Sequence, residues 1–156
     1  MVLLVGCGES VEEKPAQPSA SDLTTPSHFE ETKAKAEAGD AFAQNSLGLM
    51  YRNGIGVKKD YAKALEWHRK SAAQNNHYGQ NSLGLMYRKG IGVKKDYAKA
   101  LEWYRKSAAQ NNHYTQASLG WMYQKGEGVT KDAKEAVKWY RKAVEQGKPL
   151  PKKILE

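Results

Sequence analysis

The four histidines are the first candidates for chemistry, because imidazole can act as a metal ligand or as a general base near neutral pH. His77 and His113 lie 36 residues apart, and neither has a second histidine, a cysteine or an acid beside it at metal-ligand spacing. One and two periods after His68 the chain has Tyr104 and Tyr140, which favours a packing role for that histidine. No nucleophile stands beside a base and an orienting acid. The pattern predicts no catalytic residue, no metal and no cofactor.

The segment Gly54-Ile55-Gly56 could be mistaken for a phosphate-binding loop. No strand pattern precedes it, and the lysine followed by serine or threonine that completes a P-loop is missing. Two glycines supply the positive φ angles that a tight turn needs. We therefore interpret the segment as a turn between two helices.

Cys7 is the one cysteine of the chain, so no intramolecular disulfide can form. Residues 4–7, Leu-Val-Gly-Cys, have the form of a bacterial lipobox, in which the cysteine is lipidated and becomes the mature N-terminus. A signal peptide needs a basic start and an apolar segment of roughly 7 to 15 residues, and neither fits before Cys7. We expect residues 1–7 to be a truncated lipoprotein signal, with the true start upstream or the chain trimmed. The alternative is a chance match in a disordered tail.

Residues 8–28 contain three prolines, several serines and few apolar side chains, a composition that cannot bury enough surface to fold. We predict a disordered linker whose reach is roughly 25 Å, enough to hold a domain clear of a membrane surface. No segment approaches the roughly 20 apolar residues of a membrane-spanning helix.

The net charge is +8 for the whole chain. Residues 1–28 carry one lysine against four acids, a net charge of −3, so the remainder carries +11. Such a basic body can favour nucleic acid, an anionic membrane or envelope polymer, or an acidic protein; a solvated lysine-rich surface is the alternative. No nucleic-acid-binding module is recognisable, so nucleic acid is not expected as a partner.

The chain contains a 36-residue unit written three times in tandem. Residues 43–78 and 79–114 are identical except at three positions, and residues 115–148 form a more diverged third copy. A fixed period of this length indicates a repeat architecture, in which each unit buries its apolar face against its neighbours.

Each unit reads as two helices joined by the glycine turn. The apolar face of the first helix consists of Ala43, Leu47, Met50 and Tyr51. Gly54 is predicted to end that helix, and Asp60 to cap the next one. One face of the second helix consists of Ala64, Trp67, His68, Ser71 and Ala72. A glycine inside the first helix costs about 1 kcal/mol against alanine, so Gly48 predicts a close approach of the second helix, with Trp67 filling the space beside it.

These features resemble the Sel-one-like repeat (SLR) family, a branch of the tetratricopeptide superfamily: leucine-glycine in the first helix, G-x-G-V in the loop, then aspartate, alanine and tryptophan. The resemblance covers residues 29–148. It implies an all-α fold, a right-handed α/α superhelical solenoid of helix-turn-helix repeats, and a role as a scaffold for protein interactions. One cysteine-rich branch is described as binding penicillin, and this chain has no cysteine in its repeats, which argues against that activity.

The expected organisation is therefore a solenoid over residues 29–156. Its expected parts are a cap helix at 29–42, repeats at 43–78, 79–114 and 115–148, and a C-terminal cap or truncated helix at 149–156.

The resemblance also implies a binding surface, because in tetratricopeptide-like stacks the side of the first helix opposite the Leu47 face lines the concave surface. The residues predicted there are Asn45, Leu49, Arg52 and Asn53, then Asn81, Leu85, Arg88 and Lys89, then Ala117, Trp121, Gln124 and Lys125. An apolar residue that recurs at 49, 85 and 121 on a polar face needs a partner, either the adjacent repeat or a bound peptide. In the second case the asparagines and arginines would hydrogen-bond an extended peptide, and Leu49, Leu85 and Trp121 would anchor its side chains.

The function expected from these patterns is a protein-interaction scaffold in the bacterial cell envelope, tethered to the outer membrane through Cys7. It would be cytoplasmic if the lipobox match is accidental. The partner would be a protein or peptide, an acidic one among the options. The alternatives are an inhibitor or immunity protein against a secreted cell-wall hydrolase and a penicillin-binding or β-lactamase-like enzyme.

Overall fold

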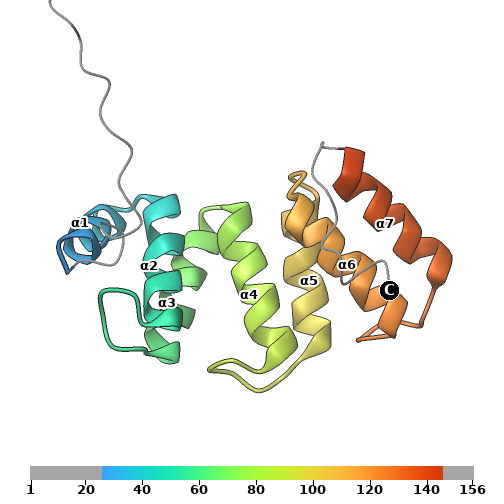
Figure 1. Cartoon of the computed structure of the whole chain (residues 1–156), viewed down its shortest axis with the longest axis horizontal. Helices are drawn as coiled ribbons and strands as arrows, with labels where there is room; N and C mark the ends of the chain where they lie inside the picture. Colours follow the sequence, from blue (N-terminus) through green and yellow to red (C-terminus); the bar gives the residue numbers. More distant parts are fainter. Residues whose placement is uncertain (1–25, 146–156) are drawn as a thin grey trace, which may run out of the picture.

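The computed structural model describes residues 26–145, and Figure 1 shows them as a row of α-helices running from α1 to α7. The helices are α1 (Pro26–Glu37), α2 (Ala41–Asn53), α3 (Tyr61–Ala73), α4 (His77–Lys89), α5 (Tyr97–Ala108), α6 (His113–Lys125) and α7 (Ala133–Glu145). Within this range no helix is long and apolar enough to cross a membrane.

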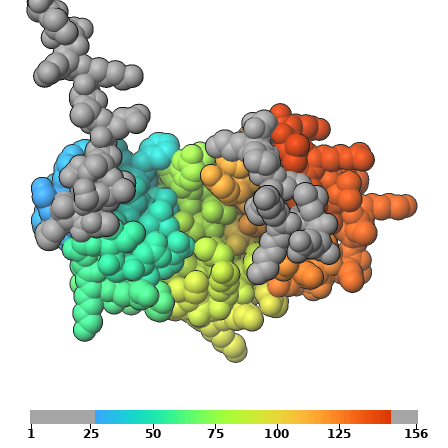
Figure 2. All heavy atoms as spheres, viewed as in Figure 1, coloured from blue at the N-terminus to red at the C-terminus, as the bar shows by residue number. Residues whose placement is uncertain are grey.

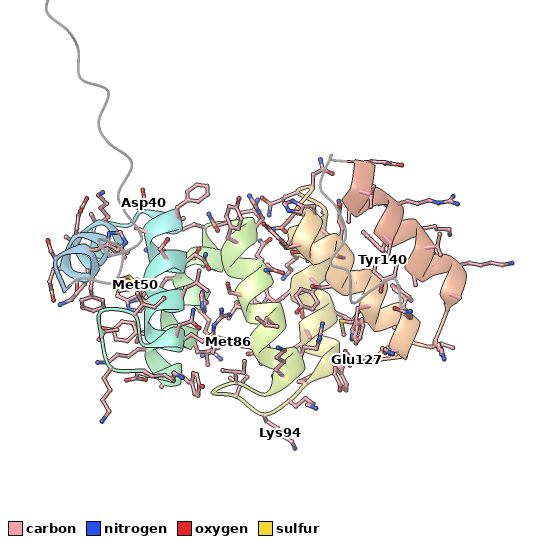
Figure 3. The ribbon with its side chains drawn as sticks, viewed as in Figure 1. Asp40, Met50, Met86, Lys94, Glu127 and Tyr140 are labelled. Carbon is pink, nitrogen blue, oxygen red and sulfur yellow. The ribbon has the colours of Figure 1, made fainter. Side chains whose placement is uncertain are left out.

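The helices form pairs, α2 with α3, α4 with α5 and α6 with α7, and each pair is one copy of the 36-residue unit. The loops inside the pairs follow one edge of the row, where the label of Lys94 marks the loop between α4 and α5 (Figures 1 and 3). Figure 2 shows that the pairs pack side by side into one elongated body. The predicted all-α solenoid of helix-turn-helix repeats is confirmed.

Caps define the helix ends, as the sequence predicts. The carboxylate of Asp60 accepts a hydrogen bond from the backbone N–H of Lys63 at 3.0 Å, which satisfies one of the unpaired donors at the start of α3. Asp96 does the same for α5. Gly54 has a φ of +74°, and its N–H donates to the carbonyl of Met50 at 2.8 Å, so α2 ends in a left-handed turn that favours glycine.

The core lies between the helices of each pair and between successive pairs. The leucines that recur in the first helices, Leu47, Leu83 and Leu119, expose no surface, and Met86 and Met122 are likewise fully buried. Because each of these side chains lies on the face predicted from helical periodicity, the amphipathic assignment of the first helix is confirmed.

The start of the solenoid differs from the prediction. Helix α1 begins at Pro26, inside the segment expected to be a linker, and it ends at Glu37 rather than at 42. Gly39 then takes a φ of +99°, and the Asp40 carboxylate caps the N–H of Ala43 at 2.7 Å, so that α2 starts at Ala41. Cys7, most of the expected linker and the expected terminal piece 149–156 lie outside the described residues.

The reason for the glycine inside the first helix also differs. A Cβ on Gly48 would lie 2.7 Å from the His68 imidazole, and one on Gly120 would lie 2.5 Å from the ring of Tyr140. Trp67, expected to fill this space, is instead partly buried, and the Lys70 ammonium lies 4.1 Å from the centre of its ring. The close contact therefore lies one residue further along the second helix, at the histidine or tyrosine that follows the tryptophan.

Candidate functional site

The predicted binding residues lie on α2, α4 and α6, three successive helices of the solenoid. The apolar members, Leu49, Leu85 and Trp121, are each partly exposed. Leu47 and Leu83, two residues earlier on α2 and α4, are fully buried. The apolar members therefore keep part of their surface accessible.

Two of the three predicted asparagines, Asn45 and Asn81, contact the next repeat. Asn45 is buried, and its Oδ1 accepts a hydrogen bond from the Ser82 hydroxyl at 2.9 Å. Asn81 accepts from the Thr115 hydroxyl at 2.9 Å in the same way. These bonds tie α2 to α4 and α4 to α6, and a buried amide that bonds to a neighbouring hydroxyl is a packing element. The Oδ1 of Asn45 is therefore used in packing against the next repeat, and ligand binding by Asn45 stays a prediction.

The two predicted arginines have different surroundings. Arg88 lies on α4, and its Nε is 3.4 Å from Oε2 of Glu127, which belongs to the loop between α6 and α7 (Figure 3). Both side chains are mostly buried, with 19% of Arg88 and 24% of Glu127 exposed. Arg52 is the equivalent residue on α2, and its Nε donates to Asn53 Oδ1 at 3.3 Å. Burial lowers the pKa of Arg52, and no carboxylate of the described chain lies within ion-pair distance of it.

On the second helices, His68 and Tyr104, which lie behind these positions, are buried, whereas the equivalent Tyr140 is partly exposed. His68 exposes no surface, and burial, helped by the positive charge of Arg52, lowers its pKa to about 3, so the ring is neutral at pH 7. Burial raises the pKa of Tyr104, its equivalent on α5, to about 12, against the opposing effect of Arg88. Tyr140 on α7 donates its hydroxyl proton to Gln124 Oε1 at 2.8 Å. Gln124 is thus bonded within its own repeat.

The third repeat presents a cation beside an indole. The Lys125 ammonium lies 4.8 Å from the centre of the Trp121 ring, within the range of a cation–π interaction. The Trp121 N–H is buried and has no acceptor within residues 26–145. Of the remaining predicted residues, Asn53 and Lys89 are exposed at the ends of α2 and α4, whereas Ala117 is buried.

A second exposed surface, formed by aromatic side chains, was not predicted from the sequence. Phe42, Tyr78 and Tyr114 lie near the starts of α2, α4 and α6 and are 60%, 41% and 58% exposed. The rings of Phe42 and Tyr78 touch, with their centroids 5.9 Å apart. Their 36-residue spacing was the available signal, but it was hidden because Phe42 was assigned to the cap helix. We call these three residues the aromatic row.

On the side of the second helices, α5 and the loop before α7 enclose a shallow depression of about 510 Å³. It is lined by Ala98, Leu101, Glu102, Arg105, Lys106, Gly128 and Val129. Lys106 pairs with Glu102 at 2.8 Å, and Arg105 donates to the Tyr123 hydroxyl at 3.3 Å, so both cations already have partners there. In the part of the chain that the structure describes, no three metal-ligating side chains come close enough to hold an ion.

The sequence matches the Sel1 repeat three times, at residues 41–76, 77–112 and 113–148. The chain belongs to the Sel1 repeat family. The resemblance read from the motifs is therefore confirmed, with each match starting two residues before the expected repeat. Proteins of the Sel1 repeat family generally act as scaffolds for protein–protein interactions and are typically non-enzymatic.

Solved structures show the same fold. A Sel1 repeat protein from Oxalobacter formigenes is 37% identical with a TM-score of 0.75, over 79% of this chain and 50% of that one. The protein c5321, a protective antigen of uropathogenic Escherichia coli with an SLR fold, is 44% identical with a TM-score of 0.73, over 77% of this chain and 26% of that one. These similarities confirm the predicted right-handed, tetratricopeptide-like superhelix.

A shorter match joins the chain to a putative sel1-like repeat-containing protein, L18, of Acanthamoeba polyphaga mimivirus. The two are 51% identical over 47 residues, which is 30% of this chain and 8% of that protein. The chain thus spans about half of the Oxalobacter structure and much smaller parts of the other two relatives.

Proposed function

We propose that this Sel1 repeat chain is an interaction module that binds a protein or peptide along α2, α4 and α6. The observation that carries the proposal is the recurrence of a partly exposed apolar side chain at one position of three successive helices. We call Leu49, Leu85 and Trp121, with the cations Arg52 and Lys125 beside them, the α2–α4–α6 surface.

The chemistry of this surface suits a polypeptide. Covering apolar surface contributes about 25 cal/mol for each Å² removed from water, and large side chains such as Trp121 are typical centres of binding energy. Arginine and lysine next to them can pair with carboxylates or carbonyl groups of the partner. A row that repeats along a solenoid fits an extended segment better than a small molecule, because each repeat contributes one contact.

We further propose that the module works in the bacterial cell envelope, anchored through a lipid on Cys7. The Leu-Val-Gly-Cys stretch supports this location. A bacterial expression strain carrying the gene with its upstream codons should yield a protein with an acyl mass on Cys7, and Cys7→Ser should lack it. Unmodified Cys7 in the wild-type protein would refute the anchor and leave the binding surface untouched.

The binding surface is tested by capture from an envelope extract of the source organism. The purified full chain is compared with a variant carrying Leu49→Glu, Leu85→Glu and Trp121→Glu. A control variant carries Phe42→Ser and Tyr78→Ser in the aromatic row, which changes an exposed surface elsewhere. We expect the triple variant to lose the captured partner and the control to keep it, while circular dichroism shows unchanged helix content. Retention of every partner by a helical triple variant would show that the surface is wrong, and loss in the control alone would place binding on the aromatic row.

A further inference from the structure

We propose that Arg52 binds the carboxylate of an acidic side chain in the partner polypeptide, in the place that Glu127 takes beside Arg88 one repeat later. The inference rests on the proposed binding function and names the class of segment that the α2–α4–α6 surface recognises. It comes from comparing two nearly identical repeats within one chain.

The second repeat shows what a complete site looks like. Arg88 on α4 receives the carboxylate of Glu127 at 3.4 Å from the loop that follows α6. The Tyr104 hydroxyl interacts with the same guanidinium. Because both ionised groups are mostly buried, the pair is screened from water and the two charges offset each other.

The first repeat has the arginine without these partners. Ile91 is the residue one 36-residue period before Glu127, and His68 is the residue one period before Tyr104. Arg52 is partly buried, and among residues 26–145 no carboxylate comes within 4.0 Å of it. A guanidinium that is partly removed from water without an opposite charge loses part of its solvation, and a carboxylate that arrives from outside can offset this loss.

His68 is a second, independent indication. Its imidazole exposes no surface, and neither ring nitrogen has a hydrogen-bond partner in the described part of the chain. Tyr104 and Tyr140 place a hydroxyl at the far end of a longer ring, which reaches the residue on the first helix. The shorter imidazole leaves Arg52 without that contact.

The pair of Arg88 and Glu127 in the second repeat indicates which group would bind Arg52. The group that forms an ion pair with the equivalent arginine is a glutamate carboxylate on a polypeptide. A guanidinium in general suits a carboxylate, because its planar array of donors matches the two oxygens. Leu49 lies three residues before Arg52 on α2, so the two side chains are neighbours on one helix face. The described residues carry 21 lysines and arginines against 12 aspartates and glutamates, which favours the approach of an acidic segment.

The test uses the full chain and two fluorescein-labelled probe peptides. Both peptides carry leucines spaced along a Gly-Ser background. One has glutamate between the leucines, and the other has glutamine at the same positions. Ile91→Glu supplies a carboxylate at the position of Glu127, and Ile91→Gln is the matched control of equal size without charge. Circular dichroism shows whether each variant stays helical, and the variants are compared in one buffer because salt weakens all charge pairs.

We expect the wild type and Ile91→Gln to bind the glutamate peptide roughly tenfold more tightly than the glutamine peptide. Ile91→Glu should bind the two peptides alike and should shift the NMR resonance of the Arg52 Nε–H without any peptide. Glu127→Ile should increase the preference for glutamate, because it releases Arg88. A wild type without preference, or a preference that survives in Ile91→Glu, would overturn the assignment to Arg52.

The same data separate this inference from the proposed function. If both peptides bind equally and the Leu49, Leu85 and Trp121 triple variant loses both, the binding surface stands and the carboxylate site is wrong. If the triple variant binds both peptides as the wild type does, while Ile91→Glu abolishes the preference, Arg52 is right and the apolar part of the surface is wrong. Absence of binding by either peptide overturns the inference.

Discussion

Acid should destabilise the protein through His68, and the size of the effect follows from its burial. The pKa of the buried imidazole is about 3, whereas the ordinary value, which applies to the unfolded chain, is 6.5. Because the unfolded chain binds the proton more strongly, stability is complete above pH 6.5 and falls as the pH drops toward 3. Between pH 7 and pH 4.5 this one histidine should remove about 2.5 kcal/mol from the free energy of unfolding.

The matched control is His68→Tyr, which introduces the residue that the second and third repeats have at this position. Urea unfolding at pH 7 and pH 4.5, followed by circular dichroism, gives the loss of stability for each protein. Carboxylates and the other histidines titrate in both, so their contributions cancel in the difference. The wild type should lose about 2.5 kcal/mol more than His68→Tyr over this interval. Equal losses in the two proteins would refute the burial of a neutral imidazole at this site.

Three further changes probe the packing of the repeats. Gly120→Ala puts a Cβ 2.5 Å from Tyr140 and should cost roughly 1–3 kcal/mol, measured as a lower urea midpoint; an unchanged midpoint would contradict the contact. Glu127→Gln leaves Arg88 mostly buried without its counter-charge and should cost about 1–3 kcal/mol, a loss that Glu127→Asp should partly restore. Asp96→Ala removes the cap of α5 and should cost about 1 kcal/mol, whereas Asp96→Asn should be nearly neutral.

The regular parts of the fold could be predicted because periodicity states which side chains share a face. Leu47 and Leu83 recur at the same place in two repeats, and both are fully buried. Asp60 precedes a helical pattern after a glycine turn, and it caps α3 as expected. These are local properties, since helix period and caps depend on neighbours within a few residues.

Contacts across helices could not be predicted in the same way. Trp67 and His68 are adjacent on α3 and point only about 100° apart, so periodicity does not decide which of them meets Gly48. The bond between Ser82 and Asn45 joins positions 37 residues apart and depends on how one repeat is placed on the next. The start of α2 depends on Gly39 and Asp40. Both residues precede position 43, where sequence identity places the start of the first repeat, so the repeat pattern did not include them.

Near identity of two repeats does not give them the same chemistry, because each repeat is completed by the loop of the next. Arg52 and Arg88 occupy equivalent positions, yet the residue one period before Glu127, the partner of Arg88, is Ile91. Because the third copy has a glutamate at this position, Arg88 of the second repeat is paired with a carboxylate. Arg52 of the first repeat keeps its positive charge without such a partner within residues 26–145. If the proposals at Trp121 and Arg52 are both right, Trp121 supplies an apolar contact and Arg52 selects the charge of the partner, so that the two contacts would fix the direction in which an acidic segment lies along the solenoid.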